Sequence, residues 1–410
     1  MKDPNKLNRI IAGTLSILFL GFIFLSLGVT LVNDGTTLID SVRLMKHLKS
    51  YLPDPENYNV LDLLNARIQS FTSQISESLW LKDELGYLNS DFQYSLGKRM
   101  ITTGGQNMVT LNTGHLYDIQ GDVSMKPGAD NVIAIRDSLP EDIPFLFVYE
   151  HPTLYDPAML PAGYDVLDHS EELAADVIAR MREGGVEVID SRDVLNASGY
   201  PLEDLLMYTD QHWSTLAALV MAREVTGRVA EITGVPLDPD LLDPEEMNTE
   251  LFEKRFLGKY GQRVGTDRID PDDLIVYWPK YETEIFRNSL RTTSYQDAYG
   301  DFRAAAVRED RLLPDEGKSY NLLGYTYYGQ VEAYDYYINP NAPDITVMLI
   351  KDSYSAPIGA FMSLAAQKVI SVDIRHEAMD YLECVEKYDP DIVVMAYSLQ
   401  MLRNDEYAFM

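Results

Sequence analysis

The stretch "DITVMLIKDSYSAPIGAFMSLAAQ", residues Asp344–Gln367, predicts a buried strand followed directly by a helix. The apolar run ends at Ile350, and the polar letters "KDSYS" come next. Pro357 then stands where the first turn of a helix accepts proline. Ser353 is therefore expected just past the carboxyl end of a strand and just before a helix.

The same alternation recurs along much of the chain and indicates an α/β fold. Strands alternating with helices predict a mostly parallel sheet that is covered by helices on both faces. The other predicted strands are "IPFLFVY" (143–149), "VEVID" (186–190), "KVISVDI" (368–374) and "DIVVMAYS" (391–398). The main predicted helices are 171–185, 214–234 and 377–388.

Residues 236–342 interrupt this alternation. They are rich in Asp, Pro, Tyr and Gly, and their strand-like pieces, such as "DDLIVYWP", are short. We expect a long insertion that lies over the sheet within one domain spanning 100–410. That domain opens with Gly-Gly and Asn-Thr-Gly turn signals between short β-type runs in residues 100–119, which predict a hairpin or meander.

Residues 10–32, "IIAGTLSILFLGFIFLSLGVTLV", form an uncharged apolar run of 23 residues. As a helix it reaches about 35 Å, which spans the hydrocarbon core of a bilayer. Basic residues precede the run and acidic residues follow it, so we predict a cytoplasmic N-terminus and an extracytoplasmic C-terminal domain. We favour an uncleaved single-pass transmembrane anchor over residues 1–33. A cleaved signal has a shorter core and a small-x-small site, and a buried soluble helix is not apolar all round.

Residues 34–99 are predicted to form a helical stalk or N-terminal layer. Apolar residues recur at intervals of three and four, and "LPDPEN" divides the helical pattern into two pieces. The periodic run is short, so we favour packing on the protein's own domain over a coiled-coil dimer.

Composition excludes several classes of function. Apolar residues make up 46% of the 410 residues, which permits a large core. The net charge of −30 repels nucleic-acid phosphates and argues against peripheral binding to a membrane surface. Cys384 is the only cysteine, so neither an intrachain disulfide nor a cysteine-based zinc site is possible.

Ser353 is a candidate nucleophile because of its predicted place. Ligands bind at the carboxyl edge of open α/β sheets, and backbone N–H groups at a helix start stabilise an oxyanion. A serine becomes nucleophilic only when a base reaches it. The alternative is that Asp352 and Ser353 simply cap the following helix.

The stretch "LLMYTDQHWSTLAALV" (205–220) offers such a base. Asp210 and His212 are two positions apart, so in an extended segment both side chains point to one side, and the carboxylate can orient the imidazole. The helix start near Ser214 favours a neutral imidazole. The alternatives are a helix cap beside a buried imidazole, or a metal site shared with His151, for which no further ligand spacing exists.

Together the two stretches resemble the DHHW family and the alginate O-acetyltransferases with an SGNH-hydrolase-like domain. The matching residues are "TDQHWS" (209–214) and "LIKDSYS" (349–355). Supporting matches are "LNSDFQYSLGKRM", "GKYGQRVG", "DDLIVYWPKY", "ISVDIR" and "YDPDIVVMAY", so the resemblance runs from residue 88 to the C-terminus.

The resemblance implies a catalytic triad in which Ser353 is the nucleophile, His212 the general base and Asp210 its orienting partner. The Asp-x-His pair precedes the serine, as in the rearranged members of the SGNH superfamily. Two positions depart from the family pattern: Lys351 replaces the usual glycine before Asp-Ser, and Gln211 replaces the second position of the DHHW signature. We expect Lys351 to point away from the site and Gln211 to point opposite to its two neighbours.

Four further residues are weaker candidates for binding substrate: Arg375, His151, Tyr155 and Tyr354. An ion pair is the alternative for Arg375, and core or loop packing is the alternative for His151 and Tyr155. A tyrosine-rich segment offers faces for sugar rings, although such residues are more often half-buried strand positions. Its members are Tyr320, Tyr325, Tyr327, Tyr328, Tyr334, Tyr336 and Tyr337.

The implied function is O-acylation, most simply O-acetylation, of a cell-surface or secreted polysaccharide by a membrane-anchored extracytoplasmic enzyme. The triad requires no metal and no bound cofactor. The acyl donor is a small molecule or a multispanning membrane-bound O-acyltransferase, a partner that the resemblance implies. Two alternatives remain: a carbohydrate esterase with the same triad, and a non-catalytic glycan-binding or assembly component of an exopolysaccharide export complex.

Overall fold

The computed structural model describes residues 82–403 except 104–105, 292–293, 330–331 and 376–379, and Gly21 before them. The chain divides into two compact units, Met1–Phe92 and Gln93–Met410. Helix α3 (Lys82–Ser95) crosses this division, and all other described elements belong to the second unit. The predicted anchor and most of the predicted stalk lie outside the described residues. No helix in the described part of the chain is long and apolar enough to cross a membrane.

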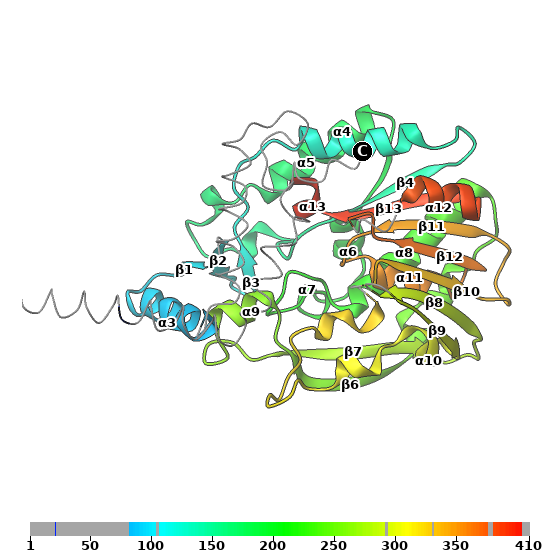
Figure 1. Cartoon of the computed structure of the whole chain (residues 1–410). Helices are drawn as coiled ribbons and strands as arrows, with labels where there is room; N and C mark the ends of the chain where they lie inside the picture. The colour runs from blue at the N-terminus through cyan, green and yellow to red at the C-terminus, as the bar shows by residue number, and fades with distance from the viewer. Residues whose placement is uncertain are drawn as a thin grey trace, which may run out of the picture. The chain divides into compact units, whose positions relative to one another are not determined.

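The second unit is built around an eight-stranded sheet with the order β5-β4-β13-β11-β12-β10-β8-β9 (Figure 1). The first five strands in this order pair in parallel. They are the five strands predicted from the sequence, namely the strand that precedes Ser353 and the four others. The α/β prediction with a mostly parallel sheet is confirmed. The parallel strands are β4 (Phe145–Glu150), β5 (Glu187–Asp190), β11 (Thr346–Lys351), β12 (Lys368–Val372) and β13 (Ile392–Ser398).

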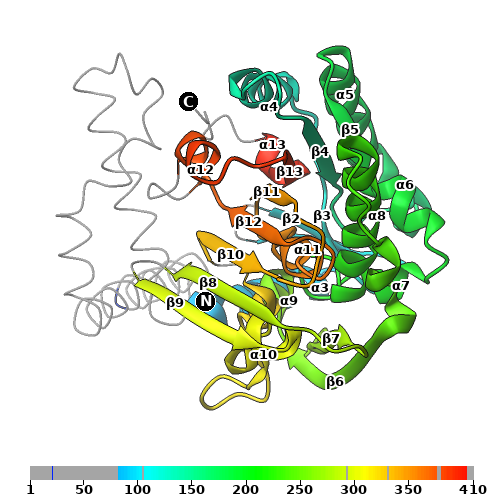
Figure 2. The same cartoon turned by 90° about the vertical axis from the view of Figure 1, so that its right-hand side faces the viewer.

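Successive side chains of β11 point to opposite faces of the sheet, and a separate hydrophobic core lies on each face. Val347 and Leu349 pack in the core that contains α6, α8 and α11, whereas Met348 and Ile350 pack in the core that contains α4, α5, α12 and α13. The helices therefore cover both faces (Figures 1 and 2). Their bounds are α4 Lys126–Ser138, α5 Ser170–Glu183, α6 Ser191–Ala197, α8 Thr215–Thr233, α11 Ala356–Met362, α12 Tyr381–Tyr388 and α13 Leu399–Arg403.

The predicted insertion contributes three strands to the sheet itself. Strand β10 (Tyr334–Ile338) pairs antiparallel with β12, and β8 (Ile285–Arg291) and β9 (Ser294–Gly300) continue outward from it. The expectation that the whole insertion lies over the sheet is therefore wrong for these strands. Without them β12 would be an edge strand with a row of unpaired backbone groups, and pairing satisfies those groups.

The remainder of the insertion forms a separate hairpin that carries part of the candidate site. Strands β6 (Met247–Phe256) and β7 (Asp272–Pro279) pair antiparallel, and the short helix α9 (Lys259–Val264) lies between them. The predicted meander is also present, as β1 (Met100–Thr103), β2 (Gln106–Thr110) and β3 (Leu116–Asp118).

Helix α8 begins and ends where its sequence predicts. The Ser214 hydroxyl accepts a hydrogen bond from the Ala217 N–H at 3.3 Å, which caps the first turn. At the other end Gly234 adopts a left-handed conformation with φ of 72°, which closes the helix. These caps fix the start of α8 directly after the Asp210–His212 segment.

Gly227 lies in the interior of α8, and a Cβ atom there would meet no neighbour within 4 Å. We expect Gly227→Ala to raise the free energy of unfolding by about 0.5–1 kcal/mol, because alanine loses less backbone freedom in a helix. Gly234→Ala is the matched control and should lower it, since its φ is +72°. Urea denaturation at equilibrium measures both changes, and shifts of the same sign would contradict this account.

Candidate active site

Ser353 lies in the turn that joins β11 to α11, at the carboxyl edge of the parallel strands. The Asp352 carboxylate holds this turn, accepting hydrogen bonds from the N–H of Tyr354 at 2.8 Å and the N–H of Ser398 at 2.9 Å. The cap position of α11 is Ser355, and no side chain caps that helix. Asp352 therefore ties the turn to β13, and the alternative that Asp352 and Ser353 cap the helix is not observed.

The structure brings Asp210 and His212 to this turn. His212 Nε2 lies 2.8 Å from Ser353 Oγ, although the two residues are 141 positions apart. His212 Nδ1 makes a short hydrogen bond to Asp210 Oδ1. Because an ionised carboxylate only accepts, Nδ1 carries the proton and the Nε2 lone pair faces the serine hydroxyl. The predicted proximity of these three side chains is confirmed.

Two further hydrogen bonds lock the segments of the serine and the histidine together. The Trp213 indole N–H donates to the Tyr354 carbonyl at 3.0 Å, and the Tyr354 hydroxyl donates to the Gln211 carbonyl at 2.6 Å. Trp213 is buried, as its predicted packing role requires. Gln211 contributes to this contact through its backbone carbonyl.

Aromatic rings enclose the imidazole of His212. Tyr325 stacks on it with ring centroids 4.5 Å apart and planes 18° apart, and Tyr354 lies 4.6 Å away on a tilted plane. Tyr325 belongs to the short helix η8 (Gly324–Tyr328) of the insertion. Sequence reasoning noted it only as one of seven tyrosines, because nothing in its local pattern distinguishes it from the buried Tyr327 and Tyr328.

The loop before α9 satisfies the second oxygen of Asp210. The Lys259 N–H donates to Asp210 Oδ2 at 2.7 Å, and the Gly258 N–H donates to the Thr209 hydroxyl at 2.7 Å. Asp210 is completely buried. Burial opposes its ionisation, but the adjacent His212 and the backbone N–H groups outweigh burial and hold the pKa of Asp210 below 3.8. The carboxylate is therefore charged and able to orient His212.

Asp272, at the start of β7, supports the same segment from the other side. Its carboxylate accepts hydrogen bonds from the Tyr208 N–H at 2.6 Å and the Thr209 N–H at 2.9 Å. Burial raises the pKa of Asp272 to about 7, although these bonds partly offset it. Sequence reasoning missed this role because the acid lies 63 positions from its partner.

Two buried ionisable residues lie beneath the turn. Lys351 is fully buried, and its Nζ donates to the Glu332 carbonyl at 2.8 Å. Burial lowers the pKa of Lys351, while Asp373 and Asp335 partly restore it. Glu150, at the end of β4, is also fully buried, and burial together with the neighbouring Asp352 carboxylate raises its pKa well above the ordinary range. An acid that ends the apolar run "FLFVYE" was the available signal for Glu150.

The weaker candidates for substrate binding are placed less favourably. His151 and Tyr155 are 1% and 5% exposed, respectively, and both contact the Ser191 region of the core, so the structure supports the packing alternative. Arg375 is half-buried and pairs with Asp373, with Nε 2.7 Å from Oδ1, which is the ion-pair alternative. Tyr354 is buried but lines the small hollow at Ser353.

The alternative of a metal site at Asp210, His212 and His151 is not supported by the arrangement of side chains. Among the residues that the structure describes, no three His, Cys, Asp or Glu side chains are gathered as metal ligands would be. His151 instead lies 2.9 Å from the Tyr149 hydroxyl, measured at Nδ1.

Residues 153–307 match the model of a family described as "SGNH hydrolase-like domain, acetyltransferase AlgX". This segment is similar to an SGNH hydrolase-like domain. The resemblance predicted from the sequence is thereby confirmed. The matched segment contains Asp210 and His212 and ends before Ser353. No curated protein sequence matches this chain.

Solved structures share the fold of this domain. A DHHW family protein from Eubacterium siraeum is 17% identical and covers 75% of this chain and 95% of its own, with a TM-score of 0.55. PatB1 from Bacillus cereus, solved with a sulfonyl adduct, is 14% identical and covers 75% of this chain and 99% of its own, with a TM-score of 0.58. At these identities the likeness concerns the fold alone.

Gly258→Ala should disturb Asp210, because a Cβ atom at Gly258 would lie 2.3 Å from Asp210 Cβ and 2.5 Å from the Thr209 carbonyl oxygen. We expect the rate of Ser353 sulfonylation by phenylmethylsulfonyl fluoride to fall about tenfold or more, since the serine is activated through Asp210 and His212. Intact-mass spectrometry over time measures the rate. Gly227→Ala is the control and should react as the wild type does. An unchanged rate in folded Gly258→Ala would contradict the support ascribed to this loop.

Asp272 should make stability depend on pH. Its folded pKa of about 7 exceeds the ordinary 3.8, so its contribution is fully present below about pH 4 and is lost as the pH rises through about 7. We expect Asp272→Asn to reduce the fall in the free energy of unfolding between pH 4 and pH 8, as measured by urea denaturation. Asp273→Asn is the control on the exposed neighbour and should retain the fall. An equal fall in wild type and Asp272→Asn would refute the assignment.

Proposed function

We propose that the protein is a membrane-anchored extracytoplasmic O-acyltransferase that transfers an acetyl group to a cell-surface or secreted polysaccharide. The observation that carries the proposal is the continuous hydrogen-bonded line from Asp210 through His212 to Ser353, with 2.8 Å between His212 Nε2 and Ser353 Oγ. The match to an acetyltransferase family supports acyl transfer as the reaction type.

In the first half of the proposed reaction, Ser353 Oγ attacks the acyl carbonyl carbon of the donor, and its proton passes to His212 Nε2. The tetrahedral oxyanion collapses, the bond to the donor's leaving group breaks, and that group takes the proton from His212. Asp210 stabilises the imidazolium that forms between these events. The product is an acyl ester on Ser353.

In the second half, a sugar hydroxyl attacks the acyl-serine carbonyl while His212 accepts the hydroxyl proton. The second oxyanion collapses, and Ser353 Oγ leaves and regains the proton. Backbone N–H groups of the turn around Ser353 would stabilise both oxyanions. The Tyr354 N–H is not among them, because it donates to Asp352 at 2.8 Å.

The location and the partner are part of the proposal. The apolar run of residues 10–32 would anchor the chain with its N-terminus in the cytoplasm. A multispanning membrane-bound O-acyltransferase would then deliver the acyl group, since the proposed site faces the outside. Tyr354 remains the proposed contact for substrate beside Ser353, because it lines the small hollow there.

Covalent labelling tests whether the serine is active. We expect a fluorophosphonate probe to label full-length protein in detergent at Ser353, as PatB1 has been solved with a sulfonyl adduct. Ser353→Ala should abolish labelling, and His212→Ala should slow it about 10³-fold or more. Ser363→Ala, at a buried serine on the same connection, is the control and should label normally. Absent labelling of the folded wild type would favour the non-catalytic alternative.

The same preparation separates transfer from hydrolysis. With an activated acetyl ester as donor, a transferase should form acetylated glycan at the expense of free acetate when a suitable glycan is added. Release of acetate that is independent of added glycan, together with deacetylation of an acetylated glycan, would instead identify an esterase.

A further inference from the structure

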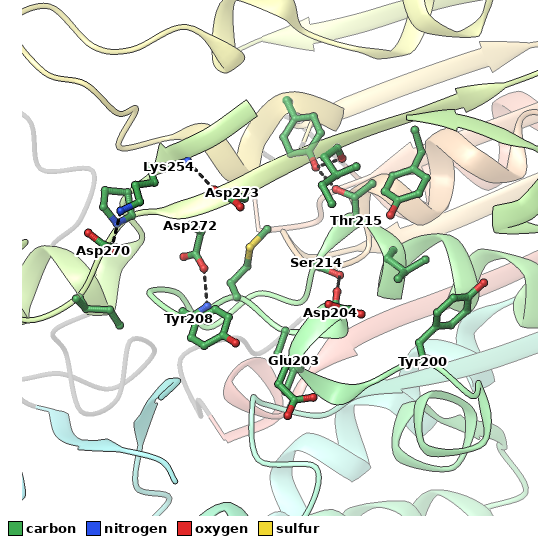
Figure 3. Close-up of a pocket in the computed structure, with 18 residues that line it drawn as sticks. Tyr200, Glu203, Asp204, Tyr208, Ser214, Thr215, Lys254, Asp270, Asp272 and Asp273 are labelled. Carbon is green, nitrogen blue, oxygen red and sulfur yellow. Dashed lines mark hydrogen bonds and ion pairs between the residues drawn. The ribbon is translucent and has the colours of Figure 1, made fainter. Parts of the chain in front are cut away.

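One hollow of this unit lies beside the candidate site and has no part in the proposed mechanism. It has a volume of about 720 Å³ and is formed by α7 (Leu202–Leu205), the start of α8 and the hairpin β6–β7 (Figure 3). This volume falls within the range of pockets that hold small organic ligands.

This hollow adjoins the reactive residues. It shares four wall residues with a second hollow of about 10 Å³ that touches Ser353 and His212. The shared residues are Met207, Ser214, Thr215 and Tyr327. The larger hollow and the hollow at Ser353 therefore meet at these four residues.

Tyrosine rings line two of its sides. Tyr200 and Tyr208 are half-exposed and flank α7 (Figure 3). The ring of Tyr208 stacks on the ring of the buried His115, with 3.9 Å between the centroids, and this contact holds the tyrosine ring in place. Rigid aromatic faces of this kind suit the apolar faces of pyranose rings, while neighbouring polar groups bond their hydroxyls.

The charged groups of the lining are acidic with one exception. Four exposed acidic residues and one lysine line the hollow, and the acidic residues are Glu203, Asp204, Asp270 and Asp273. The fifth acid of the lining, Asp272, is buried and bonded to the backbone of Tyr208 and Thr209. The lysine, Lys254, is neutralised by Asp270, with 2.8 Å between Nζ and Oδ2 (Figure 3). Carboxylates accept hydrogen bonds from sugar hydroxyls and attract amino groups, but they repel acidic sugars. The net charge of −30 acts in the same direction.

We propose that this hollow is a subsite for a sugar chain that carries no acidic groups, either neutral or amine-bearing, and that it holds the chain beside Ser353. That this chain is the acyl acceptor rests on the proposed function, whereas the binding itself does not. We do not expect a polymer of acidic sugars (uronates) to be the preferred ligand, although residues 153–307 match a family described by the acetyltransferase AlgX.

Binding to full-length Ser353→Ala protein in detergent tests the subsite without any chemistry. The probes are hexamers of N-acetylglucosamine, glucosamine and mannuronate, titrated by isothermal calorimetry at low salt. We expect at least one of the first two to bind and the mannuronate hexamer to bind at least tenfold more weakly. Tyr200→Ala should weaken binding about three- to tenfold, because one stacked ring is lost.

Tyr295→Ala is the control, since Tyr295 is 62% exposed and is not among the lining residues. Should Tyr200→Ala fail to fold, Glu203→Lys at the exposed rim replaces it and should weaken the glucosamine hexamer while improving the mannuronate hexamer. The inference is overturned if none of the hexamers binds, if mannuronate binds as tightly as the others, or if the variant at the hollow behaves as the control does.

The two proposals fail separately. Labelling of Ser353 without hexamer binding would remove the subsite and leave the acyltransferase proposal standing. Hexamer binding without labelling would keep the subsite and remove the catalytic role.

Discussion

The whole site depends on keeping one fully buried carboxylate charged. Asp210 is completely buried, so its ionised form survives only if both oxygens are satisfied within the protein. His212 satisfies Oδ1 and the Lys259 N–H satisfies Oδ2. The insertion therefore contributes directly to the candidate site. The loop between its strands β6 and β7 brings the backbone donor that bonds the second oxygen of this acid.

The close approach of Gly258 follows from that requirement. The backbone of this loop passes so near Asp210 that a Cβ atom would fall 2.3 Å from Asp210 Cβ. Asp272 on the next strand fixes the other end of the segment through the N–H groups of Tyr208 and Thr209. Aromatic contacts from Tyr325 and Tyr354 then limit rotation of the imidazole. Each restraint comes from a different part of the chain, and together they leave His212 one orientation.

Local patterns predicted the parallel sheet and the placement of Ser353, and they allowed Asp210 to pair with His212. A helix cap or a metal site stayed open for that pair until the family resemblance implied its role beside Ser353. The sheet follows from apolar periodicity, and the other two follow from side chains with recognisable chemistry at strand and helix ends. The donor at Lys259 was not predictable, because a backbone N–H is the same at every residue except proline. Tyr325, Asp272 and the sheet pairing of β8–β10 were missed for a related reason, since each depends on a partner far away in sequence.

The turn at Ser353 is fastened to a strand that comes later in the chain. Asp352 accepts the N–H of Ser398, near the end of β13, while the base for Ser353 lies 141 positions earlier. A chain that is still being synthesised thus contains Asp210 and His212 before it contains Ser353 and the strand that holds its turn. The hydrogen bond from the Ser398 N–H to Asp352 can form only when β13, the last strand of the chain, has joined the sheet. The geometry of the candidate site therefore depends on the C-terminal strand.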